Sequence, residues 1–267
     1  MFRETRIQKI QEIVNKKGAV RVNELAEMLS VSTMTIRRDL LSMMDKGLID
    51  RTYGGAVLAK EQNLLQAPIL MRMRDQAEEK KAIAQAVAKT IKHGETIYIA
   101  AGTTMYWVAK AIANRSNLTV VTNSLPVANL LITSEGIDVI IVGGFLRRKD
   151  FSLIGHLAER IVHDLRVDKV IVGCGGVSPE FGLTNEYMED MMMDRTYMSI
   201  SKNIIVVVDH TKLGRVAKSY TCPVTSVQTI VTSNLASPEI VKQLRRQGVE
   251  VLLVNIEEPS GLKNEAN

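Results

Sequence analysis

The chain has 267 residues, 46% hydrophobic and 24% charged, a length and composition that suit one small domain plus one of about 200 residues. Its net charge of +5 permits a nucleic-acid partner without requiring one. No stretch approaches the ~20 apolar residues that span a bilayer, and the charged N-terminus lacks a signal peptide's apolar core, so we expect a cytoplasmic protein with no membrane partner.

The hydrophobic pattern divides the chain into four parts. Residues 3–58 have helical spacing and then a Gly-Gly turn, and we interpret them as a small first domain. The pattern weakens over residues 59–75, which contain Gln62, Asn63 and Pro68, and we interpret these as a linker. Residues 76–257 alternate helical segments with β-branched runs, and residues 258–267 form a polar tail.

Three helices are predicted in the first domain. The first covers about residues 4–17 and stops at Gly18, and the second begins near Asn23, a good N-cap residue. After a short turn, Ser32 can cap a third helix at about residues 33–45. A short second helix, a tight turn and an arginine-bearing third helix are typical of a helix-turn-helix.

The third helix has two distinct faces. At ~100° per residue, Ile36, Leu40 and Met43 fall together and should face the core. The opposite face and its flank carry two adjacent arginines and small hydroxyl residues, which suit the major groove because arginine reads guanine edges bidentately. The predicted DNA-contacting residues are Thr33, Met34, Thr35, Arg37, Arg38 and Ser42. From spacing alone, a three-helix bundle that contacts another protein remains an alternative.

A short β-hairpin is expected after the third helix. Residues 48–57 alternate roughly between apolar and polar on either side of Asp50-Arg51, as in the wing of a winged helix-turn-helix. Arg51 and Tyr53 could rest on the phosphate backbone of DNA.

The second domain is predicted to be α/β, with a mostly parallel sheet. Short β-branched runs alternate with helical patterns, which favours a doubly wound sheet with helices on both faces. The predicted strands are 96–100, 118–122, 137–142, 169–173, 204–208, 228–231 and 249–254.

Four loops follow predicted strands at the edge where open α/β sheets bind ligands. Gly102, Thr103 and Thr104 open a helix, where backbone N–H groups and the helix dipole favour an anion. The other loops are small, polar, glycine-rich or basic, and contribute Asn123, Ser124, Gly175, Gly176 and Lys212. Taken singly, the first loop is equally compatible with an ordinary strand-to-helix turn, the glycine cluster is weak evidence beside tight packing, and a loop lysine is most often solvated.

The chain resembles the DeoR family of sugar-metabolism regulators in its first domain. Residues 20–39 read VRVNELAEMLSVSTMTIRRD, and T-I-R-R-D-L at 35–40 is followed by R-T-Y-G-G-A at 51–56, as in that family. Two separate motifs in the right order make this resemblance specific.

The second domain carries family-like segments in the family's order. They are A-A-G-T-T at 100–104, T-N-S at 122–124, Gly143-Gly144, and the stretches 168–176, 182–184 and 209–214. The resemblance implies a fold similar to sugar-phosphate isomerases and CoA-transferases. It also implies a homo-oligomeric, sequence-specific repressor of a carbohydrate-metabolism operon, which binds a double-stranded DNA operator and is relieved by a phosphorylated sugar or related effector.

Two positions depart from the family pattern. Ala100-Ala101 replace an acidic-serine pair, and Asp194 stands where the family has a lysine that often faces the ligand. We include Asp194 among the effector-binding residues and expect a changed ligand or lost effector binding.

No catalytic residues, cofactor or metal site are expected. Glu186, Asp190 and Asp194 recur at helical spacing, which suits acid/base groups or a hard metal ion but is more typical of a solvated face. The two cysteines, Cys174 and Cys222, are expected to be reduced core thiols, and no basic neighbour in the sequence would activate Cys174. A sugar-phosphate isomerase-like enzyme with an accessory helical domain is the alternative function.

Overall fold

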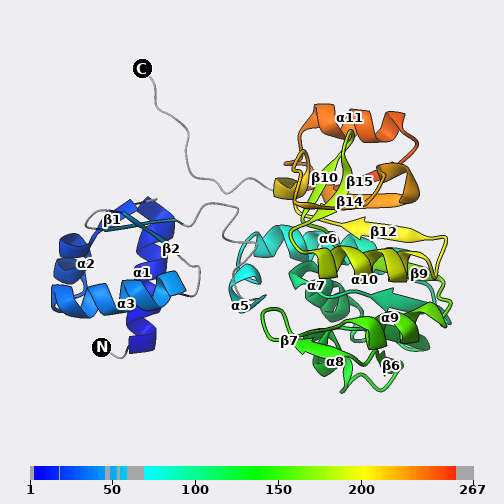
Figure 1. Cartoon of the computed structure of the whole chain (residues 1–267), viewed down its shortest axis with the longest axis horizontal. Coiled ribbons are helices and arrows are strands. Elements are labelled where there is room, and N and C mark those ends of the chain that lie inside the picture. The colour runs from blue at the N-terminus through cyan, green and yellow to red at the C-terminus, as the bar shows by residue number, and fades with distance from the viewer. Residues whose placement is uncertain (1–2, 18, 46–48, 53–54, 59–68, 257–267) are drawn as a thin grey trace. The chain divides into compact units, whose positions relative to one another are not determined.

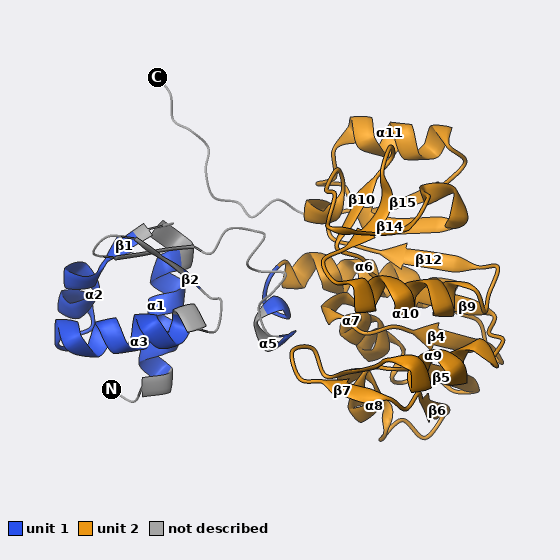
Figure 2. Cartoon of the chain, viewed as in Figure 1, with its two compact units in different colours: residues 1–75 blue, residues 76–267 orange. Residues whose placement is uncertain are grey.

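The computed structural model describes residues 3–17, 19–45, 49–52, 55–58 and 69–256 (Figure 1). The chain divides into two compact units, residues 1–75 (unit 1) and 76–267 (unit 2), which are coloured separately in Figure 2.

Unit 1 is a small bundle of helices with a three-stranded antiparallel sheet in the order β1-β3-β2. Pairing of Ile49 with Leu58 and of Thr52 with Gly55 confirms the predicted hairpin, while strand β1 was not predicted. Its elements are α1 (Arg3–Lys17), β1 (Ala19–Arg21), α2 (Val22–Met28), α3 (Thr33–Asp45), β2 (Ile49–Thr52), β3 (Gly55–Leu58) and α5 (Ile69–Arg72).

The core of unit 1 follows the helical spacing of its sequence. Ile36, Leu40 and Met43 of α3 are buried, as predicted, and pack with Ile10 of α1 and Leu25 of α2. Burial of one stripe from each helix stabilises the three-helix arrangement.

The stretch predicted as a linker is partly helical. Residues 59–68 lie outside the described residues, and the short helix α5 follows them. Ile69, at its start, is buried.

Unit 2 is built on a seven-stranded sheet in the order β15-β14-β12-β9-β4-β5-β6, in which every neighbouring pair is parallel. All seven strands lie within two residues of their predicted bounds, which confirms the predicted α/β class. They are β4 (Thr96–Ile99), β5 (Leu118–Thr122), β6 (Ile137–Ile141), β9 (Lys169–Val172), β12 (Ile204–Val207), β14 (Thr229–Ser233) and β15 (Glu250–Val254).

Two groups of helices cover this sheet. Helices α6 (Ala77–Thr90), α7 (Thr103–Ile112) and α8 (Leu125–Leu131) pack against one another in sequence order. Helix α9 (His156–His163) packs against α10 (Met188–Met198), and α10 crosses the near side of the sheet in Figure 1. Helix α11 (Pro238–Arg246) packs against β15. The central strands β9 and β12 are fully buried, as expected for a parallel sheet covered on both faces.

Smaller antiparallel elements were not predicted. A second sheet has the order β10-β11-β13, and a hairpin pairs β7 with β8. Their bounds are β7 (Phe145–Arg147), β8 (Ser152–Ile154), β10 (Gly176–Ser178), β11 (Gly182–Asn185) and β13 (Ser219–Cys222), with short 3-10 turns at His210–Lys212 and Val224–Ser226. Among the described residues, no helix is long and apolar enough to cross a membrane.

Candidate DNA-binding surface and candidate effector site

Helix α3 begins with a side-chain cap, as its sequence predicts. The Ser32 hydroxyl accepts a hydrogen bond from the backbone N–H of Thr35 at 3.2 Å and lies 2.8 Å from the Thr35 hydroxyl. This cap satisfies one of the helix's first N–H groups and sets the direction in which α3 leaves the turn.

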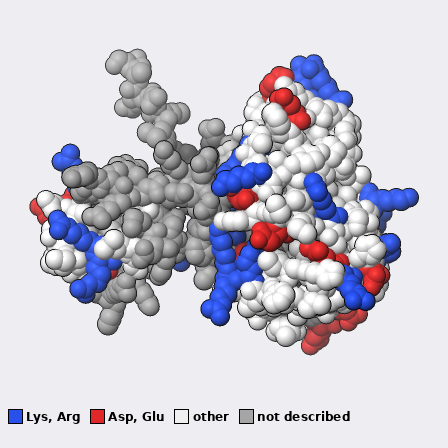
Figure 3. All heavy atoms as spheres, viewed as in Figure 1, with Lys and Arg blue, Asp and Glu red and all other residues white. Residues whose placement is uncertain are grey.

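The face of α3 opposite the core is open to solvent. Arg37 and Arg38 are both exposed, Met34 is 64% exposed, and Thr35 and Ser42 are half-buried. The structure therefore separates the predicted contact residues from Ile36, Leu40 and Met43 on the buried face. Basic side chains also gather on the visible face of unit 1 in Figure 3.

Only part of the wing lies within the described residues. The backbone of Arg51 pairs with that of Ala56 in the hairpin. Tyr53 lies outside the described residues, so its predicted role, like that of the Arg51 side chain, stays a prediction.

A buried ion pair that the sequence analysis missed holds α3 against α1. The Arg6 Nε donates to Asp39 Oδ2 at 2.5 Å, and Asp39 is 1% exposed. Asp39 directly follows Arg38, so this pair orients the helix that presents the arginines. An aspartate in the middle of an otherwise apolar helix face was the signal available in the sequence.

In unit 2, the four predicted effector loops meet at one edge of the sheet. They follow β5, β4, β9 and β12, which are consecutive in the strand order. Because the strands are parallel, their carboxyl ends share an edge, and the order of strands brings together loops separated by up to about 110 residues of sequence.

The loop after β4 has the geometry of an anion cradle. Gly102 has φ +141°, a conformation that side chains rarely adopt, and it is the N-cap of α7. The N-cap residue offers no side-chain acceptor to the first N–H groups of the helix, which lie at Thr103 and Thr104. The helix dipole favours negative charge at this position.

The loop after β5 is largely occupied by internal contacts. The Ser124 hydroxyl caps α8 by accepting from the Val127 N–H at 3.4 Å, and Ser124 is fully buried. Asn123 donates from Nδ2 to the Leu153 carbonyl at 3.1 Å, but its buried Oδ1 has no hydrogen-bond partner. Of the two, Asn123 is therefore the one with a polar group left for a ligand.

Gly175 and Gly176 make close contacts within the protein, and their predicted contact with an effector stays a prediction. The Gly175 N–H donates to the Thr184 carbonyl at 2.9 Å and to Asn185 Oδ1 at 3.0 Å. A Cβ at Gly176 would lie 2.4 Å from the Arg215 carbonyl oxygen. The backbone that approaches these glycines closely is the protein's own, because they lead into the unpredicted second sheet.

The loop after β12 is held by several hydrogen bonds. Asp209 Oδ1 accepts from the Thr211 N–H at 3.2 Å and from the Thr211 hydroxyl, and Lys212 Nζ lies 3.2 Å from Thr211 Oγ1. Lys212 is half-buried. Lys212 thus stands in a loop at the same edge as the other predicted effector loops, and its contact with an effector stays a prediction.

Asp194 is buried inside unit 2, and its predicted effector contact stays a prediction. It is 3% exposed, accepts from Asn185 Nδ2 at 2.5 Å and is bonded to the Tyr197 hydroxyl. The Tyr197 ring stacks on Tyr98 of β4 at 4.7 Å. Burial raises the pKa of Asp194 to about 8, although the hydrogen bond from Tyr197 acts in the opposite direction.

The residues of the predicted acidic stripe are engaged in ion pairs and hydrogen bonds. Glu186 precedes α10 and pairs with Arg215 at 3.0 Å, while Asp190 pairs with Arg147 at 2.5 Å. Arg147 also bonds Asp150, so it joins the β7-β8 hairpin to α10, a link that the sequence analysis missed. In the described part of the chain, no three His, Cys, Asp or Glu side chains converge on a common point.

The cysteines are free thiols, and Cys174 is not activated. Burial raises the pKa of Cys174 well above its ordinary value. At neutral pH the nucleophilic thiolate is therefore disfavoured.

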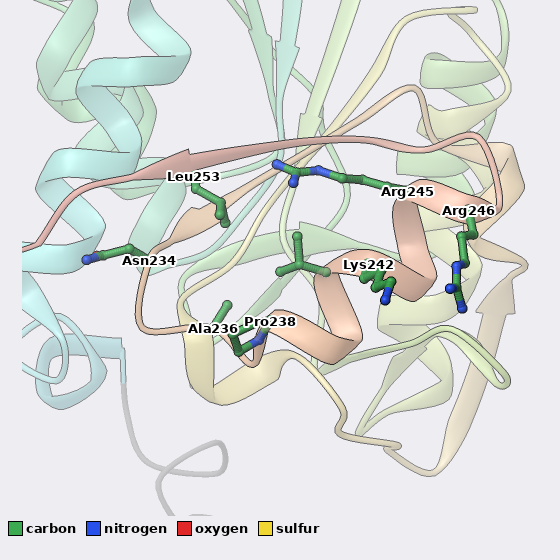
Figure 4. Close-up of a pocket in the computed structure, with 8 residues that line it drawn as sticks. Asn234, Ala236, Pro238, Lys242, Arg245, Arg246 and Leu253 are labelled. Atoms are coloured by element: carbon green, nitrogen blue, oxygen red, sulfur yellow. The ribbon is translucent and has the colours of Figure 1, made fainter.

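A separate open pocket of about 460 Å³ lies between α11 and β15, as Figure 4 shows. Its apolar lining includes Val241 and Leu253, and its rim carries Lys242, Arg245 and Arg246. Arg245 donates to the Val251 carbonyl at 2.8 Å. This pocket contains none of the predicted effector residues.

Comparison with known proteins covers both units. The family model of the DeoR-like helix-turn-helix domain matches residues 6–62, and that of the DeoR C-terminal sensor domain matches residues 75–234. The chain is 34% identical to the HTH-type transcriptional repressor CsqR of Escherichia coli, over 90% of this chain and 92% of that protein. It is 39% identical to the glycerol-3-phosphate regulon repressor of the same organism, over 77% and 81%.

Among solved structures, ribose 5-phosphate isomerase A from Methanocaldococcus jannaschii aligns with a TM-score of 0.39 and 16% identity, over 52% of this chain and 55% of that one. A likeness this low supports no conclusion about activity. The relatives that match both units are repressors, so the regulator prediction is favoured over the enzyme alternative.

Proposed function

The chain belongs to the DeoR family of DNA-binding transcriptional regulators, and we propose that it represses a carbohydrate-metabolism operon in the cytoplasm. In this proposal, residues 3–58 bind the operator, 59–75 are the linker, 76–257 sense the effector and 258–267 form a tail. The effector is a small phosphorylated sugar or a related metabolite that releases the protein from DNA.

The observation that carries the DNA-binding role is the two-sided α3. Its N-terminus is capped and its apolar stripe is buried in the core of unit 1, while Arg37 and Arg38 stand exposed on the other side. We assign direct base contacts to Arg38, Thr35 and Met34, and a phosphate contact to the flanking Arg37. Thr33, Ser42 and the wing residues Arg51 and Tyr53 complete the proposed surface.

The proposed effector site is smaller than the sequence analysis suggested. It comprises the cradle at Gly102, Thr103 and Thr104, the unpaired amide oxygen of Asn123, and Lys212. A helix N-terminus and a lysine suit a phosphate or carboxylate, and the amide suits a hydroxyl. The relative named for the glycerol-3-phosphate regulon makes glycerol 3-phosphate the first ligand to test.

Effector binding would act through linkage. A ligand changes operator affinity only to the extent that it binds the DNA-competent and DNA-incompetent states with different affinities. The free energy gained at the sheet edge then lowers the population of the arrangement that fits the operator half-sites.

We propose a homo-oligomer built on an exposed apolar surface of unit 2. Strand β6 ends the main sheet, and the neighbouring hairpin and α9 carry large apolar side chains that are between 43% and 73% exposed. An open sheet edge beside such a patch favours association with a second copy of the chain. The patch comprises Ile140, Ile141, Phe145, Leu146, Leu157 and Ile161.

Analytical ultracentrifugation tests this oligomer. Phe145→Glu should shift the protein to a smaller species, while the control Phe181→Glu, a similarly exposed phenylalanine outside the patch, should not. Unchanged sedimentation of the Phe145 variant would reject the patch as an interface.

The decisive experiment for the function is a fluorescence-anisotropy titration with DNA from upstream of the protein's own gene. We expect binding ~10³-fold tighter than to a scrambled duplex, and Arg38→Ala should lower operator affinity by about 10-fold or more. Comparison at two salt concentrations separates base readout from phosphate attraction. Equal, weak and steeply salt-dependent binding to both duplexes would contradict a specific operator in that DNA.

Glycerol 3-phosphate, ribose 5-phosphate and inorganic phosphate are then titrated into the protein–DNA complex. Release by an organic phosphate but not by inorganic phosphate supports a sugar-phosphate effector. Release that persists in Lys212→Ala would contradict the proposed site.

A further inference from the structure

A buried carboxylate joins helix α6 to the loop that carries Lys212. Glu79 is the third residue of α6 and is 2% exposed. Its Oε1 accepts from the His210 backbone N–H at 2.7 Å and from the Ser233 hydroxyl at 2.7 Å. Its Oε2 lies 2.8 Å from Nδ1 of the His210 ring.

These contacts make the carboxylate a clamp, which we call the Glu79 clamp (Glu79, His210 and Ser233). Hydrogen bonds to a buried carboxylate are stronger than neutral ones, and a buried carboxylate without donors is costly. Because a carboxylate only accepts hydrogen bonds, the clamp places a proton on Nδ1 of His210. If the loop moves away from α6, the buried carboxylate loses both of its contacts with His210 and keeps the hydrogen bond from Ser233.

On one side, the clamp reaches the proposed effector contact through two residues. His210 begins the short 3-10 turn that ends at Lys212, and the Lys212 ammonium lies beside the Thr211 hydroxyl. Asp209 holds Thr211 from the other side through Oδ1. A ligand that binds Lys212 therefore pulls on a loop whose backbone is hydrogen-bonded to Glu79.

On the other side, the clamp holds the point where the chain enters unit 2. The units divide between Asp75 and Gln76, and α6 starts at Ala77. Gln76 has φ +49°, and its carbonyl accepts the Lys80 N–H at 2.9 Å, within the same turn that bears Glu79. A shift of this turn changes the position and direction from which the connection to unit 1 departs.

We propose that Glu79 is a positioning residue that couples the 209–212 loop to the first turn of α6, and so transmits the state of the effector loop toward the DNA-binding unit. This inference rests on the proposed function, because it takes the 209–212 loop to be part of the effector site. Glu79 itself contacts neither ligand nor DNA; it acts through His210.

Hydrogen–deuterium exchange on the full-length, ligand-free chain tests the mechanical link without requiring a known effector. His210→Ala disturbs the loop, and we expect it to speed exchange in the peptide covering residues 76–86 on the order of 10-fold. Glu79→Gln should do the same, and the double variant should be no faster than the faster single variant. The control Glu78→Gln removes the same charge from the neighbouring exposed residue and should leave exchange unchanged.

Two results would overturn the coupling. One is an unchanged exchange rate of the 76–86 peptide in His210→Ala, and the other is a double variant whose rate increase equals the product of the two single increases. This readout is independent of DNA binding. It therefore stands even if the chain binds no operator, an outcome that would reject the proposed function alone.

Operator affinity provides the readout that a purely structural role would not change. Thr211→Ala releases Lys212 from its loop contact and should alter the operator Kd by about 5-fold or more. In the Glu79→Gln background the same substitution should change the operator Kd by less than about 2-fold, because the loop is then no longer coupled to α6. Equal effects in both backgrounds, or no effect in the wild-type background, would show that Glu79 only stabilises the fold.

Discussion

The proposed DNA-binding surface and the proposed effector edge present their polar groups in opposite ways. On α3, the arginines stand on one short helix and point into solvent, with the supporting ion pair of Asp39 beneath them. At the sheet edge, most polar groups are buried and already bonded to the protein, as Ser124, Gly175 and Asp194 are. A surface that meets DNA must be exposed in advance, whereas a small-ligand site can leave only a few groups unpaired.

The largest effect is expected from removing the ion pair under the DNA-binding surface. Asp39→Asn removes the negative charge beside the buried Arg6 guanidinium and should destabilise unit 1 by about 3 kcal/mol. Chemical denaturation followed by exchange in α1 and α3 measures this loss, and unit 2 should unfold as before. The exposed Glu27→Gln serves as the control, and equal stability of Asp39→Asn and Glu27→Gln would show that the pair is not structural.

Asp194 predicts a pH-dependent stability for the effector unit. Its pKa is about 8 in the folded protein against an ordinary value of 3.8, so between these values only the folded state carries the proton. The stabilisation from the bound proton is complete below the unfolded pKa and is lost as pH rises through the folded one. The free energy of unfolding should therefore fall by about 2 kcal/mol between pH 6 and pH 8.

Asp194→Asn is the matched test of that prediction. Its amide can accept from Asn185 and donate to the Tyr197 oxygen, which imitates the protonated acid without titrating. Urea denaturation at pH 6, 7 and 8 should show the fall in wild type and a weaker dependence in the variant. Parallel pH profiles would contradict the raised pKa.

Gly102 tests whether the cradle depends on backbone conformation. The position has φ +141°, yet a Cβ there would meet only Met105 Cγ at 3.8 Å. Gly102→Ala should thus cost about 1–2 kcal/mol through backbone strain alone. Gly143→Ala, at a residue with an ordinary φ and a Cβ contact of 3.7 Å, is the control, and equal thermal stability of the two variants would refute the strain.

The smallest effect is expected at the cap of α3. Ser32→Ala removes the acceptor for the Thr35 N–H and should lower the stability of unit 1 by ~1 kcal/mol. The neighbouring exposed Ser30→Ala is a suitable control for the loss of a hydroxyl. If Ser32→Ala lowered the stability of unit 1 more than Asp39→Asn does, the cap rather than the ion pair would be the main support of this surface.

The sequence alone determined the features that depend on local order. The apolar spacing of Ile36, Leu40 and Met43 predicted which side of α3 is buried, and thereby which side presents Arg37 and Arg38. Seven β-branched runs alternating with helical patterns predicted seven strands and the edge at which their loops meet. These predictions held because helix faces and strand order follow from periodicity and chain connectivity.

Only the tertiary structure decided which polar groups remain available at that edge. Asp194 becomes buried because Asn185 and Tyr197 surround it, and Gly175 loses its N–H to a second sheet that the sequence did not reveal. Glu79 and His210 are 131 residues apart, so no local pattern could pair them. A side chain's burial and its hydrogen-bond partners depend on which distant segments pack around it, and that information appears only when the chain is folded.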